Sequence, residues 1–419
     1  MSKIIFILSG YNPDYSAVGL CVKNLIDVLE HSNEVIVISE KTLSSQINQL
    51  DCKSKVFFVE SKLQKYKNIL KQKIVGLNGI KKLAYLVALI FVKIIGYLKT
   101  HLSKINVNND LVNKFTNKIS TLIEKNDILI PVCLPFESIL SSVNIKKKSP
   151  NIRVYPILFD KFSENINLHR NKLNYRIKRR VHLWLEKSIL AQCNGIFYMD
   201  SWTNHIHNYH RELNKDMLYK LEHPLIKSPA IQNTNRFFDG DISVTYAGAL
   251  YKKIRSPKYI VNLFSEVHSY NSNIKLDFYS KGDCNSYLSR KSKKNGSLNS
   301  HGEVTKKSAD IAIMSSRVLL SIGNSDITQL PSKIFEYIST GKPIIHTFKD
   351  IKDPVIKILS KYRHVLLLDE SSSIDDVLVK EVINFIINSK DVSFDEIKDE
   401  YIEATPKYVA DQIMDVIRR

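Results

Sequence analysis

The chain has 419 residues, which is enough for two domains of roughly 200 residues each. Its composition is 44% hydrophobic and 25% charged, an ordinary globular balance, and its five cysteines are scattered without a CxxC pair. This cysteine usage argues against a zinc site or a disulfide framework and indicates a reducing compartment, whereas the net charge of +19 indicates an anionic partner.

The first forty residues predict a strand, a helix and a second strand. Residues 4–8 are an apolar run, too short for a signal peptide, and they are followed by a loop at 10–19, a helix at 20–29 and a strand at 34–39. This order is Rossmann-like, and in such sheets the loop between a strand and its helix is where ligands bind. Gly19 is therefore a candidate for close approach of the backbone to a phosphate, although without a GxGxxG motif a structural turn is an equal alternative.

Residues 61–104 contain ten lysines and no Asp or Glu. Within them residues 83–98 are apolar except for Lys93 and Gly96, and sixteen residues are short for a membrane span, which needs about 20. Lysines beside an apolar helix predict a cytoplasmic protein that binds peripherally to an anionic surface, on the inner face of the membrane. One alternative is a buried helix with a solvated basic collar. Nucleic-acid binding is the other, and no recognisable nucleic-acid fold accompanies the charge.

Two further strands are predicted in the N-terminal half, at 127–134 and 154–159. In a parallel sheet their ends lie at the same edge, which directs attention to the titratable groups that follow them. These groups are Glu137, Asp160 and His169. Each of them alone is more often a loop residue than a catalyst, and no spacing connects them.

Residues 169–180, HRNKLNYRIKRR, are strongly basic and lead into a helix that continues to residue 190. They predict either an addition to a membrane or polyanion surface or a solvated helix start, and the sequence leaves both open. The last strand of this half is expected at 195–198. A polar linker is expected at 231–241.

The second half begins with a strand at 242–246, which is followed by Gly248 and by a basic loop. A glycine after a strand lets the backbone approach an anion, and cations in the next loop can neutralise a diphosphate. The cations here are Lys252, Lys253 and Arg255. A turn with surface lysines is the alternative.

A strand at 318–322 precedes a short helix that begins near Pro331 and Ser332, and a further strand is expected at 343–347. The start of such a helix suits a phosphate because its first turn offers backbone N–H groups. Glu336, one turn further in, can accept hydrogen bonds from sugar hydroxyls. The alternative is a plain surface helix with a solvated Glu336.

The segment 331–345, PSKIFEYISTGKPII, resembles the nucleotide-binding helix of GT-B glycosyltransferases, and is similar to family 4 of bacterial polysaccharide synthesis. The resemblance implies that Glu336 holds the ribose of a nucleotide-sugar. It also implies that the residues at the helix start meet the diphosphate and the sugar: Gln329, Leu330, Pro331 and Ser332. Family 4 has a second Glu eight positions earlier, where this chain has Thr328.

Residues 246–257, YAGALYKKIRSP, resemble the first strand and loop of the GT-B C-terminal domain. Many family-4 enzymes have an Arg directly after the glycine, where this chain has Ala249, so the resemblance assigns the cationic role to Arg255 or Lys253. It also assigns Gly302 to a turn beside the base and ribose, and Gly19 to a glycine of the N-terminal domain that faces the cleft between the domains.

The resemblance implies an α/β fold of two Rossmann-like domains that face a cleft. Residues 1–228 are the expected acceptor-binding domain, 238–400 the nucleotide-sugar domain, and 401–419 a helix that crosses back to the first domain. The implied activity is metal-independent transfer of a hexose, with retention, from a nucleotide-diphosphate sugar to a glycan or lipid-linked acceptor, with no cofactor. The catalytic candidates are Arg255, Lys253 and Asp160. The alternatives are a sugar-nucleotide epimerase of the same fold and a non-catalytic protein that binds sugar-nucleotides or membrane surfaces.

Overall fold

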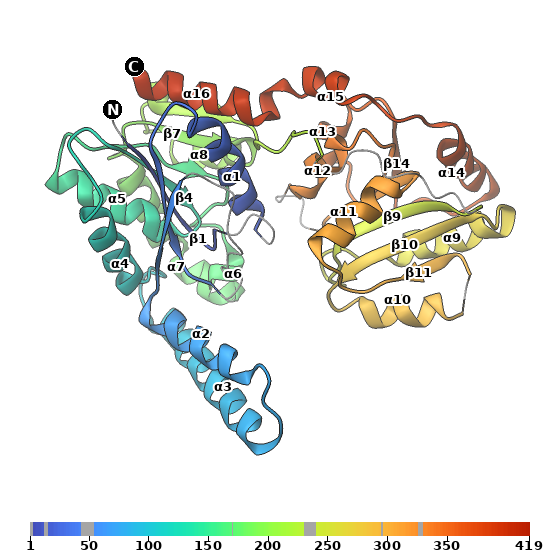
Figure 1. Ribbon diagram of the computed structural model, residues 1–419, viewed down its shortest axis with the longest axis horizontal. Helices are drawn as coiled ribbons and strands as arrows, with labels where there is room; N and C mark the ends of the chain where they lie inside the picture. The colour runs from blue at the N-terminus through green and yellow to red at the C-terminus, as the bar shows by residue number, and fades with distance from the viewer. Residues whose placement is uncertain are drawn as a thin grey trace. The chain divides into compact units, whose positions relative to one another are not determined.

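The computed structural model describes residues 3–11, 16–42, 54–169, 171–229, 240–294, 296–325 and 330–419. The chain forms two compact units (Figure 1). The first comprises Met1–Pro224 together with Pro406–Arg419, and the second comprises Leu225–Thr405. Each contains a wholly parallel sheet with helices, so the predicted α/β class is confirmed.

The first unit is built on an eight-stranded parallel sheet with the order β3-β2-β1-β4-β6-β7-β8, in which β5 pairs with β4. The central strands β1 and β4 are almost wholly buried, as their continuous apolar sequences require when helices cover both faces of a parallel sheet. The strands are β1 (Ile4–Ser9), β2 (Val35–Glu40), β3 (Lys55–Val59), β4 (Ile128–Cys133), β5 (Arg153–Val154), β6 (Ile157–Leu158), β7 (Ile196–Met199) and β8 (Leu218–Leu221).

The helices of the first unit follow the strands along the chain. They are α1 (Ala17–Leu29), α2 (Lys62–Ile74), α3 (Gly79–Leu102), α4 (Asn109–Ser120), α5 (Phe136–Lys148), α6 (Ile166–His169), α7 (Lys172–Leu190), α8 (Thr203–Tyr209) and α16 (Pro406–Arg418), with 3-10 turns η2 (Asp200–Trp202) and η3 (Lys215–Met217). The C-terminal helix α16 packs against α1, and Ile417 accepts a hydrogen bond of 2.5 Å from the guanidinium of Arg153. The predicted return of the C-terminal helix to the first domain is therefore confirmed.

Several predicted boundaries in the first unit were wrong. The strand expected at 154–159 is two short strands, β5 and β6, because Pro156 lies between them and has no N–H to donate. The strand β7 is not the last, since β8 follows it at the edge of the sheet. The final helix begins at Pro406, not at residue 401, because proline suits the first turn of a helix.

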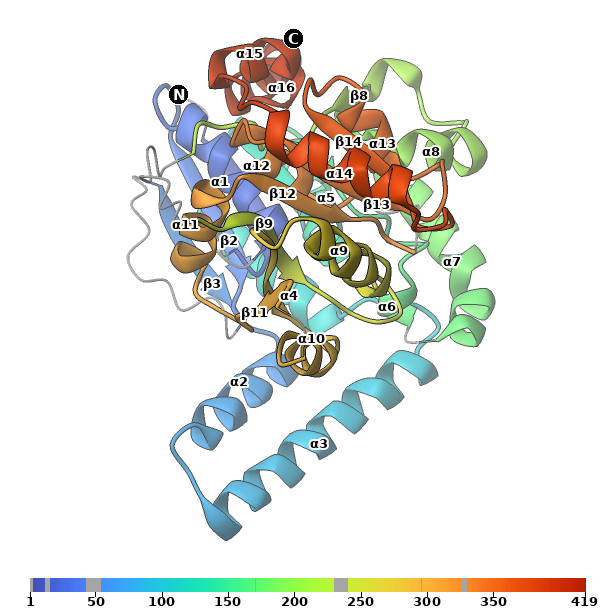
Figure 2. The same cartoon turned by 90° about the vertical axis from the view of Figure 1, so that its right-hand side faces the viewer.

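The helices α2 and α3 form a hairpin that projects away from the sheet of the first unit (Figures 1 and 2). The helix α3 has 24 residues, well beyond the apolar stretch expected from the sequence, and by length and composition alone it can cross a membrane. Leu89 is its one buried residue. The alternative of a helix buried in the first unit is therefore wrong, because α3 packs against α2 and leaves most of its apolar side chains exposed.

The second unit contains a six-stranded parallel sheet with the order β11-β10-β9-β12-β13-β14. This is the 3-2-1-4-5-6 order of a Rossmann fold. The strands are β9 (Ile242–Ala249), β10 (Ile274–Lys281), β11 (Leu298–Ser300), β12 (Val318–Ile322), β13 (Ile344–Phe348) and β14 (Val365–Asp369). The first of them is longer than predicted, so that Gly248 lies inside β9 opposite Ser280 of β10 and not in the loop that follows.

The helices of the second unit alternate with its strands. They are α9 (Lys258–Tyr270), α10 (Asn285–Ser292), α11 (Lys306–Ser315), α12 (Lys333–Ser339), α13 (Pro354–Leu359), α14 (Asp376–Asn388) and α15 (Phe394–Glu400), followed by the 3-10 turn η4 (Ile402–Ala404). The core lies between these helices and the sheet and is dominated by Ile, Leu, Val and Phe. Each such side chain that is fully buried contributes about 1.5–3 kcal/mol to folding.

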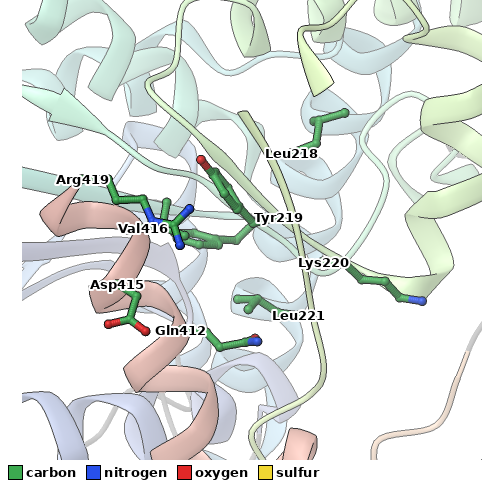
Figure 3. Close-up of a pocket in the computed structure, with 9 residues that line it drawn as sticks. Leu218, Tyr219, Lys220, Leu221, Gln412, Asp415, Val416 and Arg419 are labelled. Carbon is green, nitrogen blue, oxygen red and sulfur yellow. The ribbon is translucent and has the colours of Figure 1, made fainter. Parts of the chain in front are cut away.

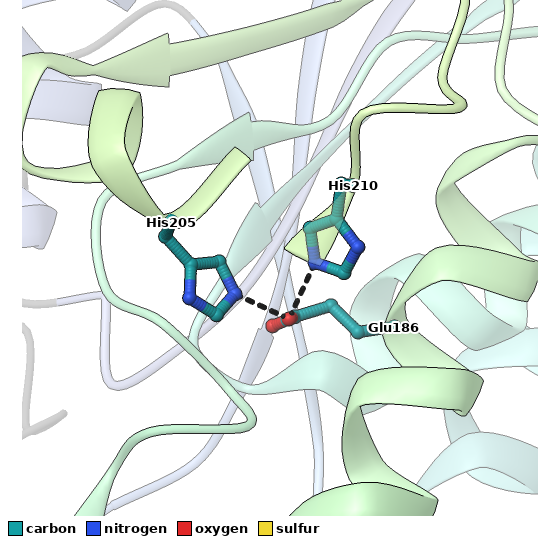
Figure 4. A group of neighbouring side chains, drawn as sticks. All are labelled: Glu186, His205 and His210. Carbon is teal, nitrogen blue, oxygen red and sulfur yellow. Dashed lines mark hydrogen bonds and ion pairs between the residues drawn. The ribbon is translucent and has the colours of Figure 1, made fainter. Parts of the chain in front are cut away.

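A buried ionic cluster holds α7 against the segment around α8 (Figure 4). One oxygen of Glu186 accepts hydrogen bonds from the hydroxyl of Ser163 at 2.7 Å, from Nε2 of His205 at 2.8 Å and from Nε2 of His210 at 2.9 Å. The side chains of Glu186, His205 and His210 are fully buried. Burial alone would raise the pKa of Glu186, but the hydrogen bonds from the two histidines outweigh it and hold the pKa at about 2.

The pH dependence of this cluster follows from the signs of the shifts. Because the folded pKa of Glu186 lies below its ordinary value of 4.5, its contribution to stability is complete above pH 4.5 and is lost as the pH falls toward 2. Burial by itself would lower the pKa of His205. Glu164 and Glu186 have the opposite and larger effect, so the folded pKa lies above its ordinary value of 6.5. The contribution of His205 is therefore complete below pH 6.5 and is lost as the pH rises through its folded pKa.

We predict that Glu186→Gln destabilises the protein by about 3–5 kcal/mol at pH 6, because it leaves buried histidines without their carboxylate. Thermal unfolding followed by circular dichroism measures this, and stability should also decline less steeply below pH 4.5 than in the wild type. Glu212→Gln is the matched control, since Glu212 makes an exposed ion pair with Lys187. Equal melting temperatures for the two variants would contradict the prediction.

Candidate functional site at the carboxyl edge of the second sheet

The candidate site begins where β9 and β12 separate. The two strands pair only at Val244 and Thr245, whereas β9 continues along β10 as far as Ala249. They are also the neighbours at which the strand order of the sheet reverses, since β10 and β11 follow on one side and β13 and β14 on the other. In open α/β sheets ligands bind outside the carboxyl ends of strands at this position.

Tyr337 of α12 lies in the space where the two strands part. Its hydroxyl accepts a hydrogen bond of 2.9 Å from the amide of Ala247 and donates one of 3.2 Å to the carbonyl of the same residue. The ring is buried, and burial raises its pKa well above the usual range, so the hydroxyl keeps its proton. This contact fixes α12, and with it the neighbouring Glu336, at the carboxyl end of β9.

Arg255 connects the loops that follow the two strands. Its Nε donates a hydrogen bond of 2.5 Å to Oδ1 of Asn324, which lies just beyond β12, and the amide of Ser325 donates to the carbonyl of Ile254 at 2.8 Å. The guanidinium also interacts with the hydroxyl of Tyr246, whose pKa is raised by burial and partly lowered again by this cation. Arg255 is thus a half-buried cation in a fixed position.

Lys253 and Lys252 differ from Arg255 because both are exposed. The sequence left Lys253 and Arg255 as alternatives for the cationic role. A guanidinium held beside the end of a strand can meet a phosphate with two parallel hydrogen bonds, whereas a flexible exposed ammonium acts as a point charge. The structure therefore favours Arg255.

Glu336 lies on α12 between two cations. Its Oε2 is 2.7 Å from Nζ of Lys333 and 3.5 Å from Nζ of Lys306, which also pairs with Asp310 at 2.8 Å. Burial opposes ionisation of the carboxyl, but the two lysines outweigh burial and hold its pKa below the ordinary value. Glu336 is thus an ionised, partly exposed carboxylate that can accept hydrogen bonds from a pair of sugar hydroxyls.

Gly302 follows β11 at the same edge of the sheet, with φ at +71° and open space where a side chain would lie. Beside it the ring of His301 stacks on Tyr279, with centroids 4.2 Å apart, and His301 Nε2 lies 2.9 Å from Asp277 Oδ1. Burial would raise the pKa of Asp277, but hydrogen bonds from His301 and neighbouring side chains lower it overall. The stacked rings offer a flat surface for a planar ligand.

The helix start matches the prediction only in part. Leu330, Pro331 and Ser332 are half-buried, whereas Gln329 and Thr328 lie outside the described residues. Free N–H groups were expected in the first turn of α12, but the amides of residues 334 and 335 donate to the carbonyls of Pro331 and Ser332. These two amides are therefore not available to a phosphate, because the turn closes tightly in 3-10 fashion.

The predicted residues of the first unit have different environments. Gly19 was expected in a loop but lies in the first turn of α1, buried, with its amide donating to Ser16 Oγ at 3.1 Å. That amide already has a partner, so the expected phosphate contact has no free donor there. Asp160 follows β6 and is exposed, and its pKa is raised because the surrounding protein desolvates the carboxyl, against an opposing effect of His223.

Glu137 and His169 have structural partners. Glu137 is buried, and its Oε1 accepts a hydrogen bond of 2.6 Å from the amide of Asn108, just before α4; burial raises its pKa. His169 is fully buried beside His182, with ring centroids 4.7 Å apart, and burial lowers its pKa. Of the three titratable groups considered from the sequence, Asp160 is the one whose carboxylate reaches solvent.

The first unit also contains a cavity and a cluster of metal-binding side chains. A cavity of about 320 Å³ lies between the edge strand β8 and α16 and contains none of the predicted residues (Figure 3). Its lining is Phe197, Leu218, Tyr219, Lys220, Leu221, Gln412, Asp415, Val416 and Arg419. The cluster of Glu186, His205 and His210 has metal-binding side chains, with ligand atoms within 4.8 Å of one another, but its buried carboxylate already bonds both histidines.

Sequence reasoning missed three residues that build the site: Tyr337, Asn324 and Lys306. Asn324 lies two residues beyond the strand β12 and Tyr337 directly follows Glu336, so proximity to the motifs was the available signal. Asn324 bonds to Arg255, 69 residues away along the chain, and Tyr337 bonds to Ala247, 90 residues away. The periodicity of a sequence carries no information about contacts at such separations.

No protein-family model matches the chain, and no curated protein matches it in sequence. Solved structures do match over nearly all of its length. A lipopolysaccharide outer core galactosyltransferase, WaaB, is 13% identical with a TM-score of 0.55, covering 99% of each chain. A variant of TarM from S. aureus in complex with fondaparinux, α-GlcNAc-glycerol and UDP is 10% identical with a TM-score of 0.58, covering 100% of each chain.

A UDP-N-acetylglucosamine 2-epimerase also matches, at 9% identity and a TM-score of 0.53 over 99% of this chain and 94% of that one. Identities this low establish the fold and leave the substrate open. Together with the two parallel Rossmann-like sheets and the returning helix α16, they show that this chain has the GT-B fold.

Proposed function

We propose that the protein is a family-4-like glycosyltransferase of bacterial surface polysaccharide synthesis. It would transfer a hexose, with retention, from a nucleotide-diphosphate sugar to a hydroxyl of a glycan or lipid-linked acceptor. The observation that carries this proposal is the arrangement at the carboxyl edge of the second sheet. There a fixed guanidinium, Arg255, and an ionised carboxylate, Glu336, both lie at the point where the strand order reverses.

The chemical demand of the reaction is to stabilise the departing nucleoside diphosphate. In the proposal Arg255 takes up the developing negative charge, Gly248 allows the diphosphate close to β9, and Glu336 holds the ribose. A preorganised cation lowers the barrier because it requires no reorganisation as charge develops. Fixed protein cations can meet this demand without a metal, so we expect turnover to persist in a chelator.

The residues around this centre have supporting roles in the proposal. Lys253 supplements the positive charge, Gly302 leaves room for the base beside the stacked His301, and the helix start from Gln329 to Ser332 meets the sugar. Asp160, in the acceptor-binding unit, is the candidate for the proton of the acceptor hydroxyl, since it follows β6, its carboxylate reaches solvent and its pKa is raised by desolvation.

Attachment to the cytoplasmic face of the membrane is the second part of the proposal. The support is the α2–α3 hairpin, whose exposed apolar side chains include Leu86, Ile90 and Phe91 and whose lysines have no neighbouring acid within residues 61–104. Apolar burial combined with lysines near anionic headgroups gives reversible attachment. A lipid-linked acceptor would then lie close to the enzyme.

Two alternatives remain testable. A sugar-nucleotide epimerase is favoured by the match to the UDP-N-acetylglucosamine 2-epimerase, and a non-catalytic binding protein by Thr328, where family 4 has a carboxylate. Incubation with a panel of UDP- and GDP-sugars separates the three. The proposed enzyme gives transfer or slow donor hydrolysis, an epimerase gives an epimerised donor, and a binding protein gives no turnover.

We predict that Glu336→Ala weakens nucleoside-diphosphate binding by about 1.5–3 kcal/mol, because hydrogen bonds to a charged group are lost. Titration calorimetry with UDP and GDP measures it, and circular dichroism checks the fold. Glu381→Ala removes an exposed carboxylate from α14 of the same unit and should leave the affinity unchanged. An unaltered dissociation constant in Glu336→Ala would remove this residue from the site.

Arg255→Ala is expected to lower turnover about 100-fold, as the loss of one preorganised donor does at other charge-stabilising sites. Lys252→Ala is the matched control, because Lys252 lies in the same loop but is exposed. Initial rates with the donor found in the panel provide the comparison. The assignment of Arg255 fails if both variants behave alike, or if Lys253→Ala is the only damaging change.

The protein is expected to sediment with vesicles that contain anionic lipid, and less with neutral vesicles or in high salt. Changing Lys71, Lys73, Lys81 and Lys82 to Gln should weaken this binding because their charges lie near the tip of the hairpin. The control removes the same charge from exposed lysines of the second unit: Lys352, Lys380, Lys390 and Lys398. Absence of wild-type binding to anionic vesicles at low salt would refute the proposed attachment.

A further inference from the structure

The helix α7 carries polar side chains on its buried face and apolar side chains on its exposed face. Over its first four turns the buried face carries Asn174, Lys178, His182 and Glu186, one turn apart, and the last turn buries Ile189 and Leu190. On the outer face Leu173, Ile177 and Trp184 are 69%, 68% and 65% exposed. A soluble surface helix has the opposite distribution, so the outer face of α7 is unusual for a surface in contact with water alone.

A row of cations runs beside this apolar row. Lys172, Arg176 and Arg180 are exposed and follow one another at intervals of four residues, which places them on one face of the helix. The one acidic residue of α7 is the buried Glu186. Among neighbouring acids, Glu164 lies 3.3 Å from Arg179, and Glu212 pairs with Lys187. The row of three cations therefore faces solvent without a paired carboxylate on its own helix.

The buried face of α7 is also connected to the base of the α2–α3 hairpin. The ammonium of Lys178 donates to the carbonyl of Thr100 and, at 3.0 Å, to Oδ1 of Asn106. At the start of α7, Nδ2 of Asn171 lies 2.8 Å from Nε2 of His101. Lys178 is only 5% exposed, so these bonds join α7 to the end of α3 inside the protein.

We propose that the outer face of α7 is an interfacial membrane-binding helix that acts together with α3. Leu173, Ile177 and Trp184 would enter the boundary between headgroups and acyl chains, and the three cations would contact lipid phosphates. The inference rests on the proposed membrane attachment of the hairpin and adds a second contact to it. Two contacts joined by internal hydrogen bonds fix which side of the first unit meets the bilayer.

The pairing of the two rows selects a bilayer over other occupants. A nucleic acid would neutralise the cations but leave Leu173 and Ile177 without an apolar partner. A second copy of the chain related by two-fold symmetry would bring Arg176 and Arg180 close to their own equivalents, at a cost in like-charge repulsion. An anionic bilayer offers phosphates and acyl chains side by side, which is the pattern of this face.

The protein contains a natural probe for the proposal. It has two tryptophans, of which Trp184 lies on the outer face of α7 and Trp202 is fully buried. On addition of phosphatidylglycerol vesicles the fluorescence of Trp184 should shift to the blue and be quenched by lipids brominated near the headgroup end of the chain. The variant Trp184→Phe reports Trp202 alone and should show no response to lipid.

A matched pair of substitutions tests the contribution of the apolar row. Ile177→Glu places a charge in the proposed interface and should lower the vesicle partition coefficient at least fivefold. Val377→Glu makes the same change at a 75%-exposed position on α14 of the second unit and should leave partitioning unaltered. Both positions are exposed on helices, so neither variant is expected to unfold the protein.

The outcomes separate this inference from the proposal on which it rests. If the protein sediments with the vesicles but Trp184 is not quenched, the role of α7 is overturned while attachment through the hairpin stands. If the protein does not sediment, both fail. A blue shift of Trp184 that depends on protein concentration without lipid, with a dimer in analytical ultracentrifugation, would assign the face to a second copy and overturn the inference.

Discussion

The separation of β9 from β12 toward the carboxyl edge of their sheet is the constraint on which the candidate site depends. Once the two strands stop pairing, the amide and carbonyl of Ala247 need another partner, and the hydroxyl of Tyr337 supplies both hydrogen bonds. The same contact positions Glu336. The hydrogen bond between Arg255 and Asn324 joins the loop after β9 to the loop after β12. A backbone requirement therefore sets the positions of the carboxylate and the cation.

The first unit shows a different use of buried polar groups. The inner face of α7 is a set of hydrogen-bonded and ionic contacts that includes the Glu186 cluster and the bonds from Lys178 to the base of α3. Buried charges are tolerated when they are paired or hydrogen-bonded: Glu186 bonds to two histidines, and Lys178 donates to the oxygens of Thr100 and Asn106. Polar side chains occupy most of the buried face, and Leu173, Ile177 and Trp184 of the same helix lie on the surface. The exposed apolar faces of α7 and α3 are thus consequences of how this unit is packed.

The candidate site was predictable to the extent that its residues belong to local motifs. Glu336 and Arg255 became candidates because each lies in a short segment with a recognisable pattern. The choice between Arg255 and Lys253 was not predictable, since it depends on Asn324, 69 residues from Arg255 along the chain. Gly19 was wrongly expected in a loop because the small residues before it were taken as loop residues, whereas α1 begins at Ala17 with the hydroxyl of Ser16 as its cap.

Local patterns in the sequence determined the α/β class, most of the strands, the division into two Rossmann-like halves and the resemblance to GT-B enzymes. The class, the strands and the two halves follow from periodicity and turn residues, which act over a few positions, whereas the resemblance rests on the segments 246–257 and 331–345. Only the tertiary structure decided which apolar residues are covered. The apolar stretch of α3 is compatible with a core helix, but its apolar side chains are mostly exposed, although α3 packs against α2 and bonds to α7 at its C-terminal end. Whether an apolar helix face is buried depends on which segments, distant in the sequence, pack against it. Hydrophobic periodicity carries no information about such long-range contacts.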